Sequence, residues 1–201
     1  MAMRIISGSA RGTKAEFGRM RIISGKAKGT KLYTLEGTNT RPTLDRVKES
    51  IFNIIQNDIE DAEILDLFAG SGAIGLEFLS RGAQKVVLCD NSKDAMAVIK
   101  RNIEKTHMDK KVQTVNADFN TCLEKVKNQK FDIIYIDPPY ETSYISEALR
   151  KIVEYGMTQK ENTIIIETDD EIRILKEIEN IKIKIVDKRK YGRATIIFLE
   201  V

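Results

Sequence analysis

Four consecutive residues, Asp137-Pro138-Pro139-Tyr140, are the part of the sequence whose residue types best fit a chemical task. They follow the apolar run 131–136 and contain two of the three prolines in the chain. Because proline fixes φ and removes a backbone N–H, the pair ends a strand and stiffens the turn that follows. A glycine or asparagine turn would serve folding as well, so we interpret the motif as a catalytic one.

This motif could activate an exocyclic amine of a nucleobase. The lone pair of such an amine is conjugated with the ring and is a poor nucleophile. The carboxylate of Asp137 and the carbonyl of Pro138 could accept its two hydrogens and stabilise the positive charge that develops as the nitrogen attacks a sulfonium methyl group. Tyr140 offers a stacking face, worth ~1–3 kcal/mol in comparable sites, and a base in a duplex would have to flip out to reach it. This chemistry requires no metal, and we predict none.

A glycine-rich loop lies earlier in the chain, in Asp66-Leu-Phe-Ala-Gly-Ser-Gly-Ala-Ile-Gly75. Its glycines allow a tight turn and a close approach of the backbone to a ligand. Asp90 ends the next predicted strand, 20 residues after Gly70, where a carboxylate can accept hydrogen bonds from ribose hydroxyls. Taken alone, this pattern fits a nicotinamide dinucleotide as well as other adenosine-containing cofactors.

Two further acids favour S-adenosyl-L-methionine, with S-adenosyl-L-homocysteine as the product. Asp66 would repel a pyrophosphate but suits the amino group of a methionine moiety. Asp118 follows the third predicted strand and could accept from the adenine amine, with Phe119 against the ring. In a parallel sheet such strand-end residues gather around one crevice. The predicted cofactor-binding residues are Asp66, Phe68, Gly70, Ser71, Gly72, Asp90, Asn91, Asp118 and Phe119.

The elements that must position these residues form an α/β pattern. Strand-like and helical segments alternate; the strands are expected at 63–68, 85–90, 112–115, 131–136 and 162–167, and the helices at 72–80, 93–105 and 143–155. The last two runs, 182–192 and 194–200, have a very short join and must pair antiparallel. We therefore predict a doubly wound, mostly parallel seven-stranded sheet with an antiparallel C-terminal strand. This Rossmann-like pattern resembles the class I methyltransferases.

The N-terminal part differs from the rest in charge. Residues 1–48 contain 11 Lys or Arg and 3 Asp or Glu, whereas residues 49–201 contain 22 and 27. A small N-terminal β-hairpin with a basic turn is predicted from 21–25 and 31–34. A helix is predicted over 44–56 with Thr43 as N-cap; its apolar face would hold Val47, Ile51, Phe52, Ile54 and Ile55. A basic arm on a mildly acidic body suits a polyanion, although a solvated tail without a partner is the alternative.

The beginning of the chain contains a repeat. Residues 3–14 recur at 20–31 with ten of twelve positions identical. One pair fits no solenoid, which needs about three units or more. The second copy begins with Met20 and continues into the body, so we interpret 1–19 as an addition at the start; a duplicated basic arm is the alternative. The predicted divisions are this extension, a basic hairpin and connection (20–48), and a methyltransferase domain (49–201).

Composition argues against several other classes. The single histidine, His107, lies in a polar stretch, which disfavours a Ser-His-Asp hydrolase or a multi-histidine metal site. Cys89 and Cys122 show no metal-binding spacing and are expected to be buried thiols. There is no signal-peptide pattern and no apolar run near the ~18 residues of a membrane span. We expect a cytoplasmic monomer that does not bind membranes.

From Met20 to Val201 the sequence resembles the RsmD-type family, which methylates the guanine N2 amine in bacterial small-subunit (16S) ribosomal RNA. The matching stretches are 20–32, 40–53, 66–77, 137–140 and 190–195. Asp137-Pro-Pro-Tyr140 is also similar to the [DNS]-PP-[YFW] motif of methyltransferases acting on adenine N6, guanine N2, cytosine N4 and glutamine. The family usually has glutamate where this chain has Asp90, one carbon shorter, which should retain the ribose role.

This resemblance implies a ribosomal RNA substrate, either free or within the small subunit or its precursor. It implies catalytic roles for Asp137, Pro138, Pro139 and Tyr140. The residues it implies in RNA binding are Arg21, Lys26, Lys28, Lys31, Arg41, Thr43 and Arg46, of which Arg46 could be only a helix surface charge. Other functions stay open: an adenine-N6 or other amino-methyltransferase on nucleic acid, a glutamine methyltransferase, a dinucleotide-binding protein, or a non-catalytic RNA-binding module.

Overall fold

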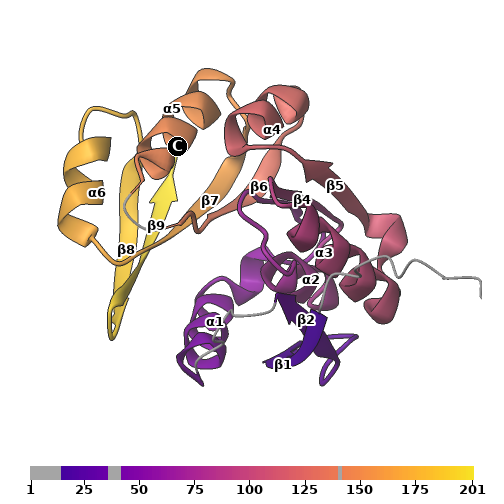
Figure 1. Cartoon of the computed structure of the whole chain (residues 1–201). Coiled ribbons are helices and arrows are strands. Elements are labelled where there is room, and N and C mark those ends of the chain that lie inside the picture. Colours follow the sequence, from indigo (N-terminus) through magenta and orange to yellow (C-terminus); the bar gives the residue numbers. More distant parts are fainter. Residues whose placement is uncertain (1–14, 36–41, 140–141) are drawn as a thin grey trace, which may run out of the picture.

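The computed structural model of the chain describes residues 15–35, 42–139 and 142–201. One seven-stranded sheet dominates it, in the order β5-β4-β3-β6-β7-β9-β8 (Figure 1). Its strands are β3 (Glu63–Asp66), β4 (Lys85–Asp90), β5 (Val112–Asn116), β6 (Phe131–Ile136), β7 (Thr158–Thr168), β8 (Lys184–Tyr191) and β9 (Ala194–Glu200). All neighbours from β5 to β7 are parallel, whereas β9 runs antiparallel between β7 and β8. The predicted fold class is confirmed.

Helices cover both faces of this sheet. One face carries α1 (Pro42–Ile54), α2 (Ala73–Ser80) and α3 (Lys93–Thr106), and the other α4 (Phe119–Val126), α5 (Tyr144–Glu154) and α6 (Glu171–Ile178). Short 3₁₀ turns occupy Gln56–Asp58 and Asp109–Lys111. Because strands such as β4 and β6 are buried on both faces, they are continuous apolar runs rather than alternating ones.

Two of these helices, α4 and α6, were absent from the sequence prediction. The signal for α4 is present, since four apolar residues recur at helical spacing and are buried: Phe119, Cys122, Leu123 and Val126. Asp118 caps this helix by accepting from the Thr121 N–H at 3.0 Å. The same pattern marks α6, with Asp170 as its cap. Both helices are short, which weakens a periodicity signal.

A separate two-stranded sheet forms from β1 (Ala15–Arg21) and β2 (Lys31–Leu35), which pair antiparallel. The predicted hairpin is therefore present, but its first strand lies earlier in the chain than 21–25. It begins at Ala15, inside the segment interpreted as an addition at the start. Residues 22–30 instead make the turn, which is closed by hydrogen bonds between Ile22 and both Thr30 and Gly29.

Four local predictions can be compared with the structure: two for α1, one for His107 and one for the cysteines. The helix begins at Pro42, so the prediction of Thr43 as its N-cap is wrong; proline suits a first helical position because its missing N–H would be unpaired there. The predicted apolar face is buried except for Ile54, which is 41% exposed. His107 is an exposed residue in a left-handed conformation after α3, and both cysteines are buried, as predicted.

The hairpin and α1 lie on the same side of the sheet as α2 and α3 (Figure 1). Ile22 and Leu32 of the hairpin are fully buried in one core cluster with Phe52 of α1 and Phe78 of α2. The N-terminal arm is therefore packed onto the body. In the described part of the chain, no helix is both long and apolar enough to cross a membrane.

Candidate active site

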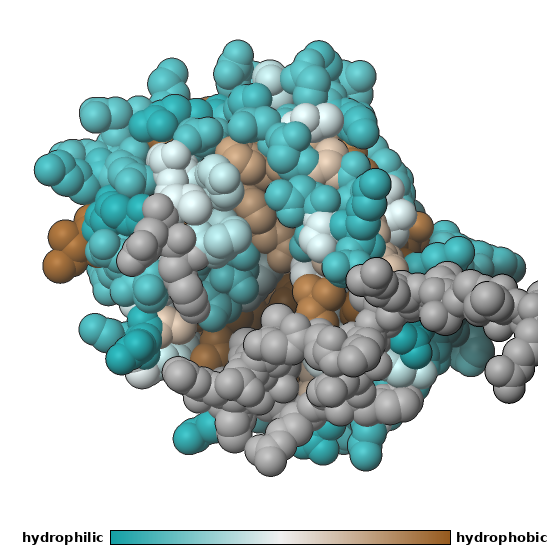
Figure 2. All heavy atoms as spheres, in the orientation of Figure 1, coloured by the Kyte–Doolittle hydropathy of each residue, from teal (hydrophilic) through white to brown (hydrophobic). Residues whose placement is uncertain are grey.

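Carboxylates gather where the parallel strands end. Asp66 and Asp90 are the last residues of β3 and β4, and Asp137 follows the last residue of β6. Two adjoining clefts open at this edge of the sheet, with volumes of about 520 and 320 Å³. Phe68 and Asp137 line both of them. We call the larger one the cofactor cleft and the smaller one the acceptor cleft. Figure 2 shows apolar residues at the bottom of a hollow on this face of the molecule.

The glycine loop between β3 and α2 is shaped by left-handed backbone. Gly70 and Gly72 have φ of +54° and +77°, which side chains other than glycine rarely allow. Gly75 lies so close to β4 that a Cβ would be 2.3 Å from the Leu88 side chain. Asp90 holds the loop, since its Oδ2 accepts from the Gly70 N–H at 2.9 Å and its Oδ1 from the Ser92 N–H at 2.8 Å.

The predicted cofactor-binding residues are distributed over the two clefts. The cofactor cleft is lined by Phe68, Asp90, Asn91, Asp118 and Phe119. The acceptor cleft is lined by Asp66, Phe68, Gly70 and Ser71. Gly72 lines neither cleft; it is the N-cap of α2, and its Cβ position faces the side chains of Leu88 and Ile99.

An aromatic cluster forms one wall of the cofactor cleft. The ring of Phe119 lies 4.8 Å from that of Tyr144 and 5.7 Å from that of Phe68. Tyr144, at the start of α5, was not among the predicted residues. Asp118 is exposed, and bonds from the N–H and hydroxyl of Thr121 lower the pKa of its carboxyl. The wall offers flat apolar surface beside acceptor oxygens, which is what an adenine ring and its amine require.

Asp137 lies at the junction of the two clefts and is half-buried. Burial raises the pKa of its carboxyl well above the usual value, and the charges of Glu167 and Asp66 raise it further. No described residue donates a hydrogen bond that offsets this. Pro138 is buried and Pro139 exposed, while Tyr140 lies outside the described residues. The motif thus presents an acceptor group that has no donor from the described protein.

Two more carboxylates line the acceptor cleft. Asp66 is fully buried, which raises the pKa of its carboxyl to about 7; the Gly75 N–H, at 3.2 Å, opposes the shift. Glu167 of β7 was not predicted, although the run 162–167 shows the same pattern of an acid at a strand end. Burial raises the pKa of Glu167 too, although the Tyr135 hydroxyl donates to its Oε2 at 2.8 Å.

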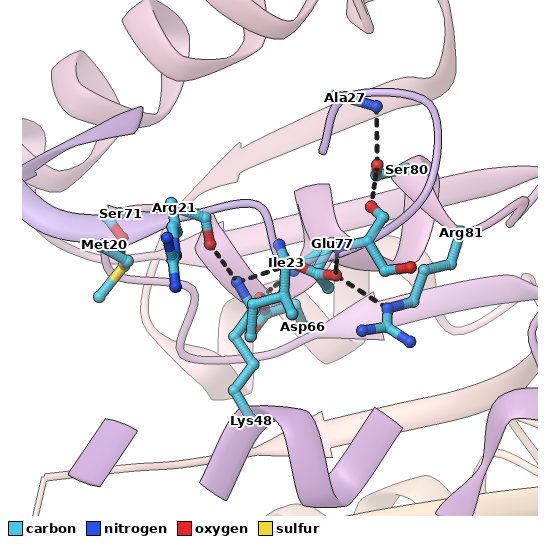
Figure 3. Close-up of polar contacts among 12 residues, drawn as sticks. Met20, Arg21, Ile23, Ala27, Lys48, Asp66, Ser71, Glu77, Ser80 and Arg81 are labelled. Carbon is cyan, nitrogen blue, oxygen red and sulfur yellow. Dashed lines mark hydrogen bonds and ion pairs between the residues drawn. The ribbon is translucent and has the colours of Figure 1, made fainter. Parts of the chain in front are cut away.

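A buried acid on α2 attaches the N-terminal arm to the body (Figure 3). Glu77 accepts from the backbone N–H groups of Ile23 and Ser24 at 2.8 and 2.9 Å, and it pairs with Lys48 and Arg81 at 2.9 and 2.8 Å. Lys48 also donates to the Arg21 carbonyl at 2.9 Å. Burial alone would raise the pKa of Glu77, but the charge of Lys48 and these hydrogen bonds lower it. We call Glu77, Ile23, Ser24, Lys48 and Arg81 the docking cluster.

Further bonds attach the hairpin to α2 and α3. The Lys26 N–H donates to the Ser80 carbonyl at 2.7 Å. Asn102 of α3 brackets the backbone of Tyr33, accepting from its N–H at 2.8 Å and donating to its carbonyl at 3.0 Å. The same amide donates to the Ser71 carbonyl in the glycine loop. Asn102 therefore anchors both the hairpin and the glycine loop.

Most of the predicted RNA-binding side chains are exposed on this docked arm. They are Arg21, Lys26, Lys28 and Lys31 on the hairpin and Arg46 on α1. Arg41 lies outside the described residues, and Thr43 lies in the first turn of α1. The arm also borders the acceptor cleft, through Met20, Thr34 and Leu35. Positive charge and the mouth of the cleft thus meet on one side of the molecule.

Known proteins resemble the chain over most of its length. A family described as conserved hypothetical protein 95 matches residues 20–200. YlbH of Bacillus subtilis is 36% identical over 174 residues, 86% of this chain and 85% of the relative. Ribosomal RNA small subunit methyltransferase D of Escherichia coli is 34% identical over 141 residues, 70% of each chain. The solved structure of yhhF from Escherichia coli, at 28% identity, has a TM-score of 0.79 and covers 90% of this chain and 97% of that one.

Proposed function

The chain belongs to the conserved hypothetical protein 95 family together with the ribosomal RNA small subunit methyltransferases D, and we propose that it methylates the N2 amine of a guanine in 16S ribosomal RNA. The methyl donor is S-adenosyl-L-methionine. The observation that carries this proposal is the position of Asp137, an acceptor to which no described residue donates, between the cofactor cleft and the cleft bordered by the basic arm.

The residues of the cofactor cleft fit this donor. Asp90 is held beside the glycine loop, where it can accept from ribose hydroxyls, and the rings of Phe68, Phe119 and Tyr144 offer surface for adenine. Asp66 lines the adjoining acceptor cleft beside the glycine loop, and it suits the amino group of the methionine moiety, whose positive charge would offset a buried anion. Gly72 serves the site as the cap that shapes the loop.

Bound S-adenosyl-L-methionine supplies a methyl group on a sulfonium sulfur: the amine nitrogen forms a bond to that carbon, the carbon–sulfur bond breaks with its electron pair left on sulfur, and the amine loses one proton. Asp137 accepts an amine hydrogen and stabilises the charge that develops on nitrogen. Its raised pKa also makes it a better acceptor for the departing proton. Pro138 and Pro139 hold this turn rigid, which keeps the carboxylate aimed at the acceptor cleft.

The N-terminal arm provides the grip on RNA in this proposal. The exposed cations of the hairpin neutralise phosphates, while the docking cluster fixes the hairpin beside the acceptor cleft. Arg46 extends the basic surface along α1. The proposed substrate is the RNA within the small subunit or its precursor, met in the cytoplasm by a monomeric enzyme.

The test is transfer of a tritiated methyl group to 16S RNA, free and in small subunits lacking the modification, followed by digestion and identification of the labelled nucleoside. The proposal predicts N2-methylguanosine at one position. Labelled N6-methyladenosine would instead assign the activity to adenine, and label only in protein would favour glutamine methylation. A parallel binding measurement should give S-adenosyl-L-homocysteine binding without NAD binding; the reverse would indicate a dinucleotide-binding protein.

A further inference from the structure

Glu167 lies in the acceptor cleft beside Asp137, and the methyl-transfer chemistry assigns it no role. The strands β6 and β7 are in parallel register with Ile136 opposite Ile166, so the next residues, Asp137 and Glu167, are neighbours across the sheet. Glu167 is only 9% exposed. Among the described residues, the Tyr135 hydroxyl is the one hydrogen-bond donor to its carboxylate. A buried acid with spare acceptor capacity beside the motif requires a reason, since such groups are usually satisfied.

We propose that Glu167 determines specificity for guanine by accepting the ring N1–H next to the amine that Asp137 binds. The inference rests on the proposed function and deepens it by naming the residue that distinguishes one base from another. Asp137 alone would accept a hydrogen bond from the exocyclic amine of any base.

The chemistry of the base edges supports this assignment. In guanine the N2 amine is adjacent to a ring N1–H, so the edge offers donors at two neighbouring atoms. The amines of adenine and cytosine are adjacent to a ring nitrogen that carries a lone pair instead. A carboxylate has only acceptor sites, so Asp137 and Glu167 side by side match the guanine edge and repel a lone pair. Sites built to pair with a polar group reject analogues that lack it.

The residues around Glu167 fix the orientation of its carboxylate. Tyr135 is 3% exposed and donates to Oε2, which orients the carboxylate and leaves Oε1 for a ligand. Both residues stand on central strands of the sheet rather than on loops, which gives the precise placement that recognition requires. No cation of the described residues forms an ion pair with Glu167, whereas Glu77 pairs with Lys48 and Arg81.

The test compares target RNA carrying guanine with RNA carrying 2-aminopurine at the nucleotide identified in the methylation experiment. 2-Aminopurine keeps the N2 amine, but its N1 has a lone pair in place of the hydrogen. We expect the wild-type protein to prefer guanine by on the order of 10²-fold or more in kcat/KM. Glu167→Gln should reduce this preference at least tenfold, because the amide can donate to N1 of the analogue. The matched control, Glu161→Gln on the exposed far end of β7, should leave the preference unchanged.

A loss of activity alone would not support the proposal, because a merely structural Glu167 would also lower it. An unchanged preference in a folded Glu167→Gln protein would overturn the proposal. Equal wild-type transfer to guanine and 2-aminopurine would overturn it as well, without any variant, and would leave guanine-N2 methylation standing. If the labelled product were N6-methyladenosine, the proposed guanine methylation and the proposed role of Glu167 would both be wrong.

Discussion

The carboxylate of the docking cluster and the three carboxylates at the strand ends contrast in what their oxygens contact. In the docking cluster, Glu77 is met by two backbone N–H groups, an ammonium and a guanidinium, all within 2.9 Å. At the strand ends, Asp66 and Glu167 each receive a single described donor, and Asp137 receives none that offsets its burial. The pKa of Glu77 is lowered, whereas those of the other three are raised.

The contrast separates a structural acid from those that we propose to bind ligands. A buried charge with a full set of partners joins two parts of a fold, because each partner is held in place by it. A buried acid with few partners destabilises the free protein, and a ligand that supplies the donors would account for its presence. The strand-end carboxylates face the clefts. In our proposal, a methionine amino group and a nucleobase amine bring the missing hydrogen-bond donors there.

The largest expected effect is on chemistry at Asp137. Replacing it with alanine removes an acceptor that acts mainly in the transition state, so transfer should fall on the order of 10³–10⁴-fold. Affinity for S-adenosyl-L-homocysteine should stay within a few-fold of the wild type. Single-turnover transfer and calorimetric binding measure the two quantities. Near-normal transfer would mean that another group activates the amine.

The next effect is on stability at Glu77. Glu77→Ala leaves Lys48, whose side chain is 6% exposed, without its buried partner, so the free energy of unfolding should fall by about 3–5 kcal/mol. Urea unfolding followed by circular dichroism measures it. Glu124→Ala is a control, because its ion pair with Lys127 is exposed to solvent and should contribute little to stability. If both variants lost the same free energy of unfolding, the buried Glu77 and the exposed Glu124 would not differ in their contribution to stability.

A smaller effect depends on pH and concerns Asp66, the fully buried strand-end acid. Its pKa is raised to about 7 from 3.8, so the folded state binds this proton more tightly than the unfolded state does. Stability from this group is complete below about pH 4 and is lost as the pH rises towards 7, by at most ~4 kcal/mol at ~1.4 kcal/mol per pH unit. Asp66→Asn carries no titrating proton and should lose less stability between pH 5 and pH 8. A parallel pH profile for the two proteins would contradict this assignment.

The smallest effect per residue concerns the basic arm. Replacing Arg21, Lys26, Lys28 and Lys31 with alanine should weaken RNA binding and reduce the slope of log K against log salt by up to about 3, at ~0.7 per phosphate contact on single strands. Filter binding over a range of salt concentrations measures it. The control removes equal charge from exposed lysines elsewhere, at Lys110, Lys125, Lys160 and Lys182, and should keep the wild-type slope. A slope that changes equally in both variants would place the RNA surface outside the arm.

The sheet could be predicted from the sequence because its strands are apolar runs that end at glycine, proline or acidic residues. The predicted bounds of 85–90 and 131–136 match β4 and β6. The acids at the ends of β3 and β4 were found from this pattern as well. The helix α4 was not predicted, since its eight residues contain only two turns of periodicity and no glycine loop marks its start, as one does for the equally short α2.

The tertiary anchors could not be predicted in this way. Glu77 and Lys48 are 29 positions apart in the sequence, and each is a charged residue of the kind that usually lies on the exposed face of a helix. Only the packing of α1 and the hairpin against α2 reveals that both are buried. Glu167 shared the strand-end pattern, but its closeness to Asp137 depends on which strands are neighbours, and periodicity does not report strand order.

The most direct test of the contrast is the free energy of unfolding of Asp137→Asn, measured at pH 8 without ligands. If Asp137 is kept for catalysis, removing a carboxylate to which no described residue donates should leave the protein as stable as the wild type or more stable. A loss of more than about 1 kcal/mol would show that the carboxylate supports the fold. The strand-end acids would then be structural, like Glu77, and their assignment to an active site would be wrong.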